Sequence, residues 1–139
     1  MTLRIGQGRF RLWGRTTIMT LQELYTKIGG DYDSAIRVLR VEKLIDKHIR
    51  KFAGSGVVSK LIEAGEAMDE TQLFEAAHAA KGVCGNLGLM KLSDLSSDIA
   101  EEFRPGNSRK LSDEDVKALL SQIAALYEET VKGIEEYSA

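Results

Sequence analysis

The stretch LFEAAHAAKGVCGNLG, from Leu73 to Gly88, decides how the rest of the chain is organised. On an α-helix of 3.6 residues per turn, five of its small or apolar residues share one stripe, which we expect to face the core. The stripe residues are Leu73, Ala77, Ala80, Cys84 and Leu87. His78 lies about 140° from the centre of this stripe. Its side chain is therefore predicted to point to solvent.

A second face of the same helix carries His78 with Lys81, Gly82 and Gly85, which follow it at i+3, i+4 and i+7. It offers an imidazole, a cation one turn away and two positions without a side chain. Each glycine in a helix interior costs about 1 kcal/mol, so two glycines on an exposed face need a reason. Close approach of another protein is one reason, and a close helix–helix contact is the alternative. For the lysine, the alternative is a solvated surface residue.

Length and composition indicate one folded, helical domain. The chain has 139 residues, of which 43% are hydrophobic and 29% charged. These values are ordinary for a globular protein with a core of its own. The single proline, the few aromatic residues and the scarcity of alternating β-branched runs favour an all-α fold.

Charge is unevenly distributed along the chain. The formal net charge is −2, but residues 1–18 contain four arginines and no acidic residue. Since these arginines carry +4, the remainder carries −6, which argues against nucleic acid as the main partner. We interpret residues 1–18 as a basic extension, flexible or loosely docked, which could touch nucleic acid or lipid head groups. Residues 19–139 are interpreted as the folded domain.

Several features favour a reducing, aqueous compartment. Cys84 is the one cysteine, so no intramolecular disulfide can form. No apolar run approaches the roughly 18 residues of a membrane span, and the N-terminus lacks the apolar segment of a secretory signal. We therefore expect a cytoplasmic, monomeric protein that does not bind membranes.

The apolar periodicity and the turn residues predict how the helices follow one another. The expected helical segments are 21–28, 31–39, 41–52, 57–68, 69–87, 89–103 and 112 to the C-terminus. Segments 41–52 and 57–68 are interpreted as a broken or kinked pair, interrupted at residues 54–56. Asp69 with Gln72, and Ser112 with Asp115, have capping-box spacing. Four long amphipathic segments joined by short breaks predict an up-and-down antiparallel four-helix bundle, with the two short N-terminal helices as lids.

The two histidines have different patterns around them. His48 lies near the middle of an apolar stripe in segment 41–52, so we interpret it as a core or boundary residue with one hydrogen bond. His78 lies off its stripe. Its position alone does not establish chemistry, because an exposed histidine between alanines is commonly an ordinary surface residue.

The sequence around His78 resembles the signature of histidine-containing phosphotransfer (HPt) domains, approximately H-x-L-K-G-x-x-x-x-L-G. The matching residues are His78, Lys81, Gly82, Leu87 and Gly88. The opening LQELYTKIGGDYDSAIRVL is similar to the start of stand-alone HPt proteins, so the resemblance extends from about Met19 to the C-terminus. Ala80 replaces the usual leucine of the signature. Because Ala80 lies on the core stripe, this departure concerns packing and not chemistry.

The resemblance implies a phosphoryl carrier. His78 would accept the phosphoryl group on a ring nitrogen, Nε2 in the family, and pass it to an aspartate of the next protein. Lys81 would balance negative charge on the phosphoryl oxygens. Gly82 and Gly85 would keep side chains out of the partner's way.

The implied partners are response-regulator receiver domains, a hybrid sensor histidine kinase, or both. Phe74, Glu75 and Lys91 are our candidates for the docking rim, with a solvated helix surface as the alternative. The sequence has no Walker-type phosphate loop, no kinase glycine-rich lid and no acidic cluster suited to Mg²⁺. We therefore expect no kinase activity, no metal site and no cofactor of its own, and Mg²⁺ supplied by the receiver.

Two other interpretations stay open. The protein could be a helical adaptor that binds receiver domains without being phosphorylated. It could also be a bundle metalloprotein or enzyme, which requires converging Glu and His ligands. The second is disfavoured because the two histidines lie on separate helices and face differently.

Overall fold

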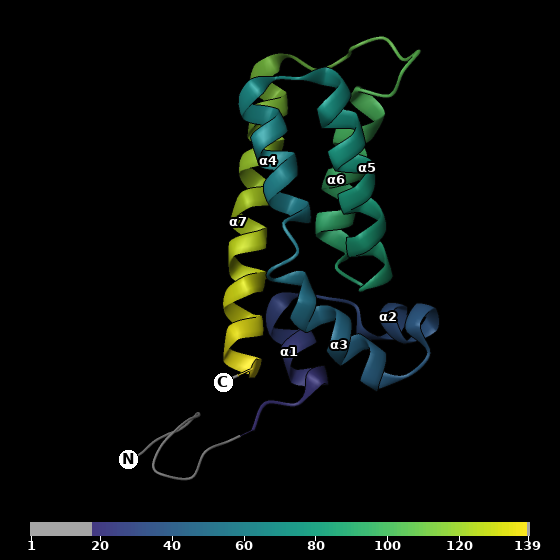
Figure 1. Ribbon diagram of the computed structural model, residues 1–139, viewed down its shortest axis with the longest axis vertical. Coiled ribbons are helices and arrows are strands. Elements are labelled where there is room, and N and C mark those ends of the chain that lie inside the picture. The colour runs from purple at the N-terminus through teal and green to yellow at the C-terminus, as the bar shows by residue number, and fades with distance from the viewer. Residues whose placement is uncertain (1–17, 139) are drawn as a thin grey trace.

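All regular structure in the computed structural model, which describes residues 18–138, is α-helical (Figure 1). The helices of these residues are α1 Leu21–Ile28, α2 Tyr32–Leu39, α3 Glu42–Phe52, α4 Val57–Ala67, α5 Glu70–Asn86, α6 Met90–Glu102 and α7 Asp113–Ser138. The predicted all-α class is confirmed for this part of the chain. The predicted basic extension, apart from the exposed Ile18, lies outside the described residues.

The helices α4, α5, α6 and the N-terminal half of α7 lie alongside one another, and α1 to α3 lie at one end of α4, α5 and α6, beside the C-terminal half of α7 (Figure 1). α5 packs against both α4 and α6, and α7 packs against the same two helices from the other side. Residues 87–89 connect α5 to α6, and contacts between the ends of these two helices show that they run antiparallel. α1 and α3 contact α7, while α2 contacts α3 and α5.

The apolar stripe of the quoted stretch forms the centre of the core. All five of its residues, from Leu73 to Leu87, are buried. Full burial of one large apolar side chain contributes about 1.5–3 kcal/mol, so this stripe holds α5 in place and turns the opposite face outward. The largest fully buried side chains are Tyr25 and Phe52, which come from the covering helices α1 and α3.

The predicted helix starts are largely confirmed. The Asp69 carboxylate accepts a hydrogen bond from the Gln72 backbone N–H (3.1 Å), and the Ser112 hydroxyl accepts one from the Asp115 N–H (3.0 Å). The box at Asp69 is only half formed, because the Asp69 N–H donates to the Ala64 carbonyl (3.2 Å) at the end of α4. In a complete capping box the Gln72 side chain would accept from the Asp69 N–H. Here the Ala64 carbonyl, in the tight turn between α4 and α5, is the acceptor instead.

The interpretation of His48 as a core or boundary residue is wrong. Ile45 and Ile49 of α3 are buried, but His48 is exposed, and Leu44 is 39% exposed. α3 is a short helix at the end of the bundle and packs mainly on α2 and α7. The buried face of α3 is therefore narrower than the face that the spacing of its apolar residues predicts.

The first two helices are anchored to the C-terminal end of α5. The buried Tyr25 hydroxyl donates to the Leu87 carbonyl (2.6 Å), and burial raises the pKa of this phenol, which keeps it a donor. The Asp31 N–H donates to the Gly88 carbonyl (2.7 Å). Gly88 has φ +73°, and a Cβ there would lie 2.2 Å from the Asp31 carbonyl oxygen. This signature glycine is therefore required for docking of α2.

A buried carboxylate organises the loop between α6 and α7. The Glu102 side chain is 5% exposed and accepts hydrogen bonds from the Arg109 Nε (2.7 Å) and from the backbone N–H groups of Lys110 (3.0 Å) and Leu111 (2.9 Å). Burial alone raises the pKa of Glu102, but the Leu111 N–H, the Arg109 guanidinium and the Lys110 N–H together hold that pKa below its usual value.

Replacing this carboxylate should destabilise the protein in a pH-dependent way. Because the folded-state pKa of Glu102 is lowered, its contribution is present above the unfolded glutamate pKa of about 4.3 and is lost as pH falls through the folded-state pKa. We expect Glu102→Gln to reduce the free energy of unfolding by about 1–3 kcal/mol at pH 7. The difference from wild type should shrink near pH 3. Urea unfolding followed by circular dichroism at both pH values measures it.

The matched control is Glu70→Gln. Glu70 contacts the same arginine (3.5 Å to Arg109 Nη1), but its side chain is 65% exposed. A surface pair of this kind contributes little, so the control should change stability by less than about 0.5 kcal/mol. Equal effects of the two substitutions would show that the buried carboxylate is not the organising group.

Candidate functional site

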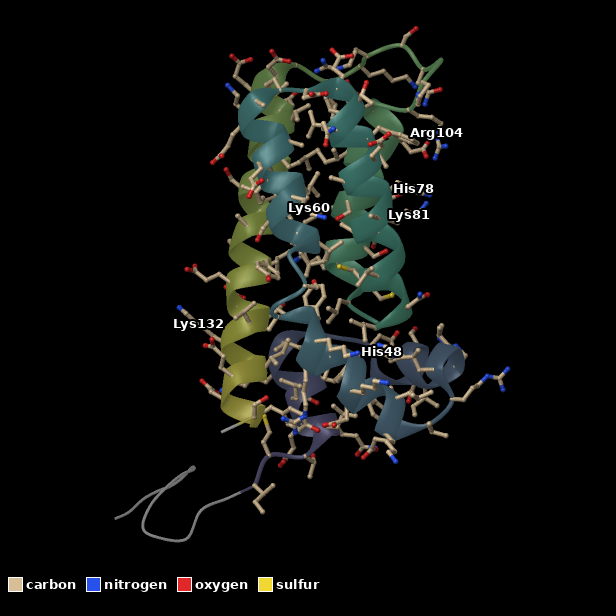
Figure 2. The ribbon with its side chains drawn as sticks, in the orientation of Figure 1. His48, Lys60, His78, Lys81, Arg104 and Lys132 are labelled. Atoms are coloured by element: carbon tan, nitrogen blue, oxygen red, sulfur yellow. The ribbon has the colours of Figure 1, made fainter. Side chains whose placement is uncertain are left out.

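His78 stands in the middle of α5 and is exposed. Its core neighbour Ala77 is fully buried, so the boundary between core and solvent passes between adjacent residues. Figure 2 shows the His78 and Lys81 side chains pointing outward on the same side of the molecule, with Arg104 of the α6–α7 region above them. The prediction that His78 faces solvent is confirmed.

The imidazole stacks on an aromatic ring one turn earlier in the helix. The ring centroids of Phe74 and His78 are 5.8 Å apart, with 24° between the ring planes. The guanidinium carbon of Arg104 lies 5.4 Å from the Phe74 centroid. Arg104 is itself held by Glu101, whose carboxylate accepts from Arg104 Nε at 3.1 Å. A continuous set of contacts therefore runs from α6 to the imidazole.

Lys81 lies on the α6 side of His78 and is half-buried. Its backbone carbonyl accepts a hydrogen bond from the Ser93 hydroxyl of α6 (3.0 Å). The pKa of Glu101 is lowered chiefly by its hydrogen bond with Arg104 and, to a smaller extent, by the charge of Lys81. Glu101 therefore interacts with both Arg104 and Lys81. These two cations and one carboxylate together carry a net positive charge close to the imidazole.

The two glycines of this face have different surroundings. Gly82 is exposed, and a Cβ placed on it would have no atom within 4 Å. A Cβ on Gly85 would lie 3.3 Å from the Ser93 Oγ, and Gly85 is half-buried. Gly82 therefore opens the surface next to His78, whereas Gly85 lies in the contact between α5 and α6.

The candidate docking rim is only partly adjacent to His78. Phe74 and Glu75 lie one turn before it on α5, and Glu75 is exposed. Lys91 is exposed in the first turn of α6, beyond the end of α5 at Asn86. At 1.5 Å per residue, that end is about 12 Å along the helix from His78.

Arg104 and Glu101 were not among the residues predicted for the site, although they lie next to it. Their i, i+3 spacing could have indicated an ion pair. Their place beside Phe74 and Lys81 depends on the antiparallel register of α5 and α6, which no local pattern encodes.

The remaining reactive groups lie elsewhere or are shielded. Cys84 is fully buried, and burial raises the pKa of its thiol to about 12, so little thiolate is present at neutral pH. Among residues 18–138 no three His, Cys, Asp or Glu side chains converge as a metal site would require. Within the same range, no helix is both long and apolar enough to cross a lipid bilayer.

Comparison with known proteins identifies a family model that matches this chain. A family model described as Hpt domain matches residues 42–130, which include α3 to α6, most of α7 and the whole His78 face. Neither the curated proteins nor the solved structures gave a match. Hpt domains serve phosphotransfer in phosphorelays as phosphoryl carriers, not as kinases, and they interact with the receiver or kinase proteins of two-component systems. Because the match spans more than half of the 139 residues, this chain belongs to the Hpt domain family.

Proposed function

We propose that His78 accepts a phosphoryl group from the aspartyl phosphate of a receiver domain, or from a kinase, and passes it to the aspartate of another receiver. The observation that carries this proposal is the exposed imidazole in the middle of α5, with the open Gly82 on one side and the Lys81 cation on the other. An imidazole with a free nitrogen lone pair is a good nucleophile toward an acyl phosphate.

The transfer step requires one nitrogen and no other group of this chain to form a covalent bond. The lone pair of the His78 ring nitrogen, Nε2 by family resemblance, forms the N–P bond. The P–O bond of the acyl phosphate breaks, and its electron pair leaves with the partner's carboxylate. Phosphoryl transfer depends mainly on alignment and charge balance. In this proposal the receiver supplies the aspartate and Mg²⁺, and Lys81 contributes positive charge.

The bundle would act as a rigid support for this nucleophile. We propose that α4 to α7 form an up-and-down antiparallel four-helix bundle, supported by the packing of α5 and α7 each against α4 and α6. The protein would work in the cytoplasm as a monomer, without a cofactor of its own. Its contact with receivers would be transient and small, burying about 1,200 Å² or less in total.

The deciding experiment is transfer from a panel of phosphorylated receivers to the purified protein. A carrier should acquire label that is labile in acid and stable in base, as expected for a phosphohistidine. A helical adaptor would bind receivers and acquire no label. Absence of label with every receiver that binds would overturn the proposal.

Removal of the Lys81 charge should slow transfer. We expect Lys81→Ala to reduce the single-turnover rate about threefold to tenfold, because a partly exposed cation contributes roughly 1 kcal/mol to stabilising nearby negative charge. The control Lys132→Ala removes an equivalent charge from α7, on the opposite side of the molecule in Figure 2. Rates that are the same in both variants and in wild type would remove the role assigned to Lys81.

Filling the open position at Gly82 should separate docking from folding. Gly82→Leu should raise helix stability by up to about 1 kcal/mol, since no atom lies near the new Cβ and leucine is the better helix former. The same side chain should obstruct a receiver and lower transfer at least tenfold. Gly82→Ala is the control, with a similar stability gain and little obstruction. Loss of helicity in Gly82→Leu would contradict this role for the glycine.

A further inference from the structure

The contacts of Phe74 distinguish it from the other candidates for the docking rim. One side of its ring faces the imidazole of His78, at 5.8 Å between centroids and 24° between planes. The Arg104 guanidinium lies over the ring at 5.4 Å, and Glu101 holds that guanidinium. Phe74 is also half-buried against the hydrophobic core. Its ring therefore packs against the core and also contacts Arg104 and His78.

An exposed histidine in a helix has few contacts of its own to select one rotamer. Helical side chains lean toward the N-terminus, so the imidazole at position 78 leans over residue 74. The offset-stacked geometry is one that aromatic pairs prefer. A ring packed against the core at position 74 thus favours the imidazole orientation that keeps the two planes nearly parallel.

We propose that Phe74 is a positioning residue that holds the His78 imidazole in the orientation required for phosphoryl transfer. The inference rests on the proposed function of His78. Phe74 does not touch the reacting phosphorus in this proposal; it acts by restricting the ring that does. Arg104 acts indirectly, through its contact with the Phe74 ring, and Glu101 acts through its hydrogen bond with Arg104.

The stack also determines the direction from which a partner can approach. On the helical wheel Phe74 and Gly82 lie about 40° to either side of His78. The Phe74 side is filled by the aromatic ring and Arg104, whereas the Gly82 side is open. The donor should therefore reach the imidazole over Gly82, which leaves the stack intact during transfer.

The test compares Phe74→Leu with Phe74→Tyr in the full chain. Leucine keeps the apolar contact with the core and loses the aromatic face. Tyrosine keeps the face, and Phe74 borders an open cavity that Thr71 and Pro105 also line. With saturating phosphorylated receiver, Phe74→Leu should lower the single-turnover rate about threefold to tenfold, with little change in the half-saturating receiver concentration. Phe74→Tyr should restore the rate to within about twofold of wild type.

A small phosphoryl donor that does not dock tests whether Phe74 affects the orientation of the His78 imidazole or its intrinsic reactivity. Phosphoramidate can phosphorylate an imidazole without a partner protein: the N–P bond to the ring forms, the original N–P bond breaks, and ammonia leaves. Its rate should be the same within about twofold in wild type, Phe74→Leu and Phe74→Tyr, because a freely diffusing donor can meet the ring in any orientation. An equal loss of rate with both donors would show that Phe74 alters the nucleophile itself, and would overturn the proposal.

Two further outcomes would count against positioning. A higher half-saturating concentration in Phe74→Leu with an unchanged saturating rate would make Phe74 a docking residue. Absence of nuclear Overhauser effects between the rings of residues 74 and 78 in wild type would mean that the stack is not populated. This measurement needs no transfer activity, so it tests the stack even if no receiver labels His78, which is the result that would defeat the proposed function.

Discussion

Replacing His78 with glutamine should abolish labelling of this protein by every phosphorylated receiver. Glutamine is close to histidine in size and polarity, but its amide nitrogen has no available lone pair for attack on phosphorus. The expected result is a fall of acid-labile, base-stable label to background. Because His78 is exposed, the free energy of unfolding should change by less than about 1 kcal/mol.

The chain offers a matched control for this substitution. His48, the other histidine, is also exposed but lies on α3. His48→Gln should retain labelling within about twofold of wild type. Label that persists in His78→Gln would move the acceptor to another residue, and label lost in His48→Gln alone would make His48 that residue.

Replacing Gly88 with alanine should produce the largest loss of stability. Gly88 has φ +73°, a backbone conformation that costs an L-residue about 1 kcal/mol or more. In addition, the new Cβ would lie 2.2 Å from the Asp31 carbonyl oxygen, a backbone atom that cannot move without α2. The hydrogen bond from the Asp31 N–H to the Gly88 carbonyl (2.7 Å) would be disturbed as well. We expect a loss of about 2–4 kcal/mol in the free energy of unfolding.

Gly29→Ala separates the two contributions to this loss. Gly29 has nearly the same backbone angle, φ +71°, but a Cβ there has no atom within 4 Å. The control should therefore cost only about 1 kcal/mol, the penalty of the backbone conformation. Urea unfolding of both variants measures the difference. Hydrogen exchange of the Asp31 amide should become faster in Gly88→Ala only; equal costs and unchanged exchange would show that α2 docking does not depend on Gly88.

The register of α5 and α6 explains what sequence reasoning missed at the site. The local pattern could place His78, Lys81, Gly82 and Gly85 on one helical face, because 3.6 residues per turn determine that geometry. It could not distinguish Gly82 from Gly85. The two differ in exposure and in whether Ser93, on the neighbouring helix, lies next to them.

The limits of apolar patterns appear in α3. The spacing of Leu44, Ile45, His48 and Ile49 predicts a broad buried stripe, yet Leu44 and His48 are exposed. A periodic pattern shows which residues share a face, but the width of the buried part depends on how many helices cover that face. At the end of the bundle, fewer helices cover it.

The all-helical class, the main helix ends and the outward direction of His78 could all be predicted from the sequence, because hydrophobic periodicity and capping act over a few residues. Three other features appear only in the folded chain: Phe74 stacks on His78 next to Arg104, α2 docks against Gly88, and Glu102 is buried among the donors of the α6–α7 loop. Each of these depends on the packing of one helix against another or on the path of a loop, and such packing is set by the whole core and not by any local stretch of residues.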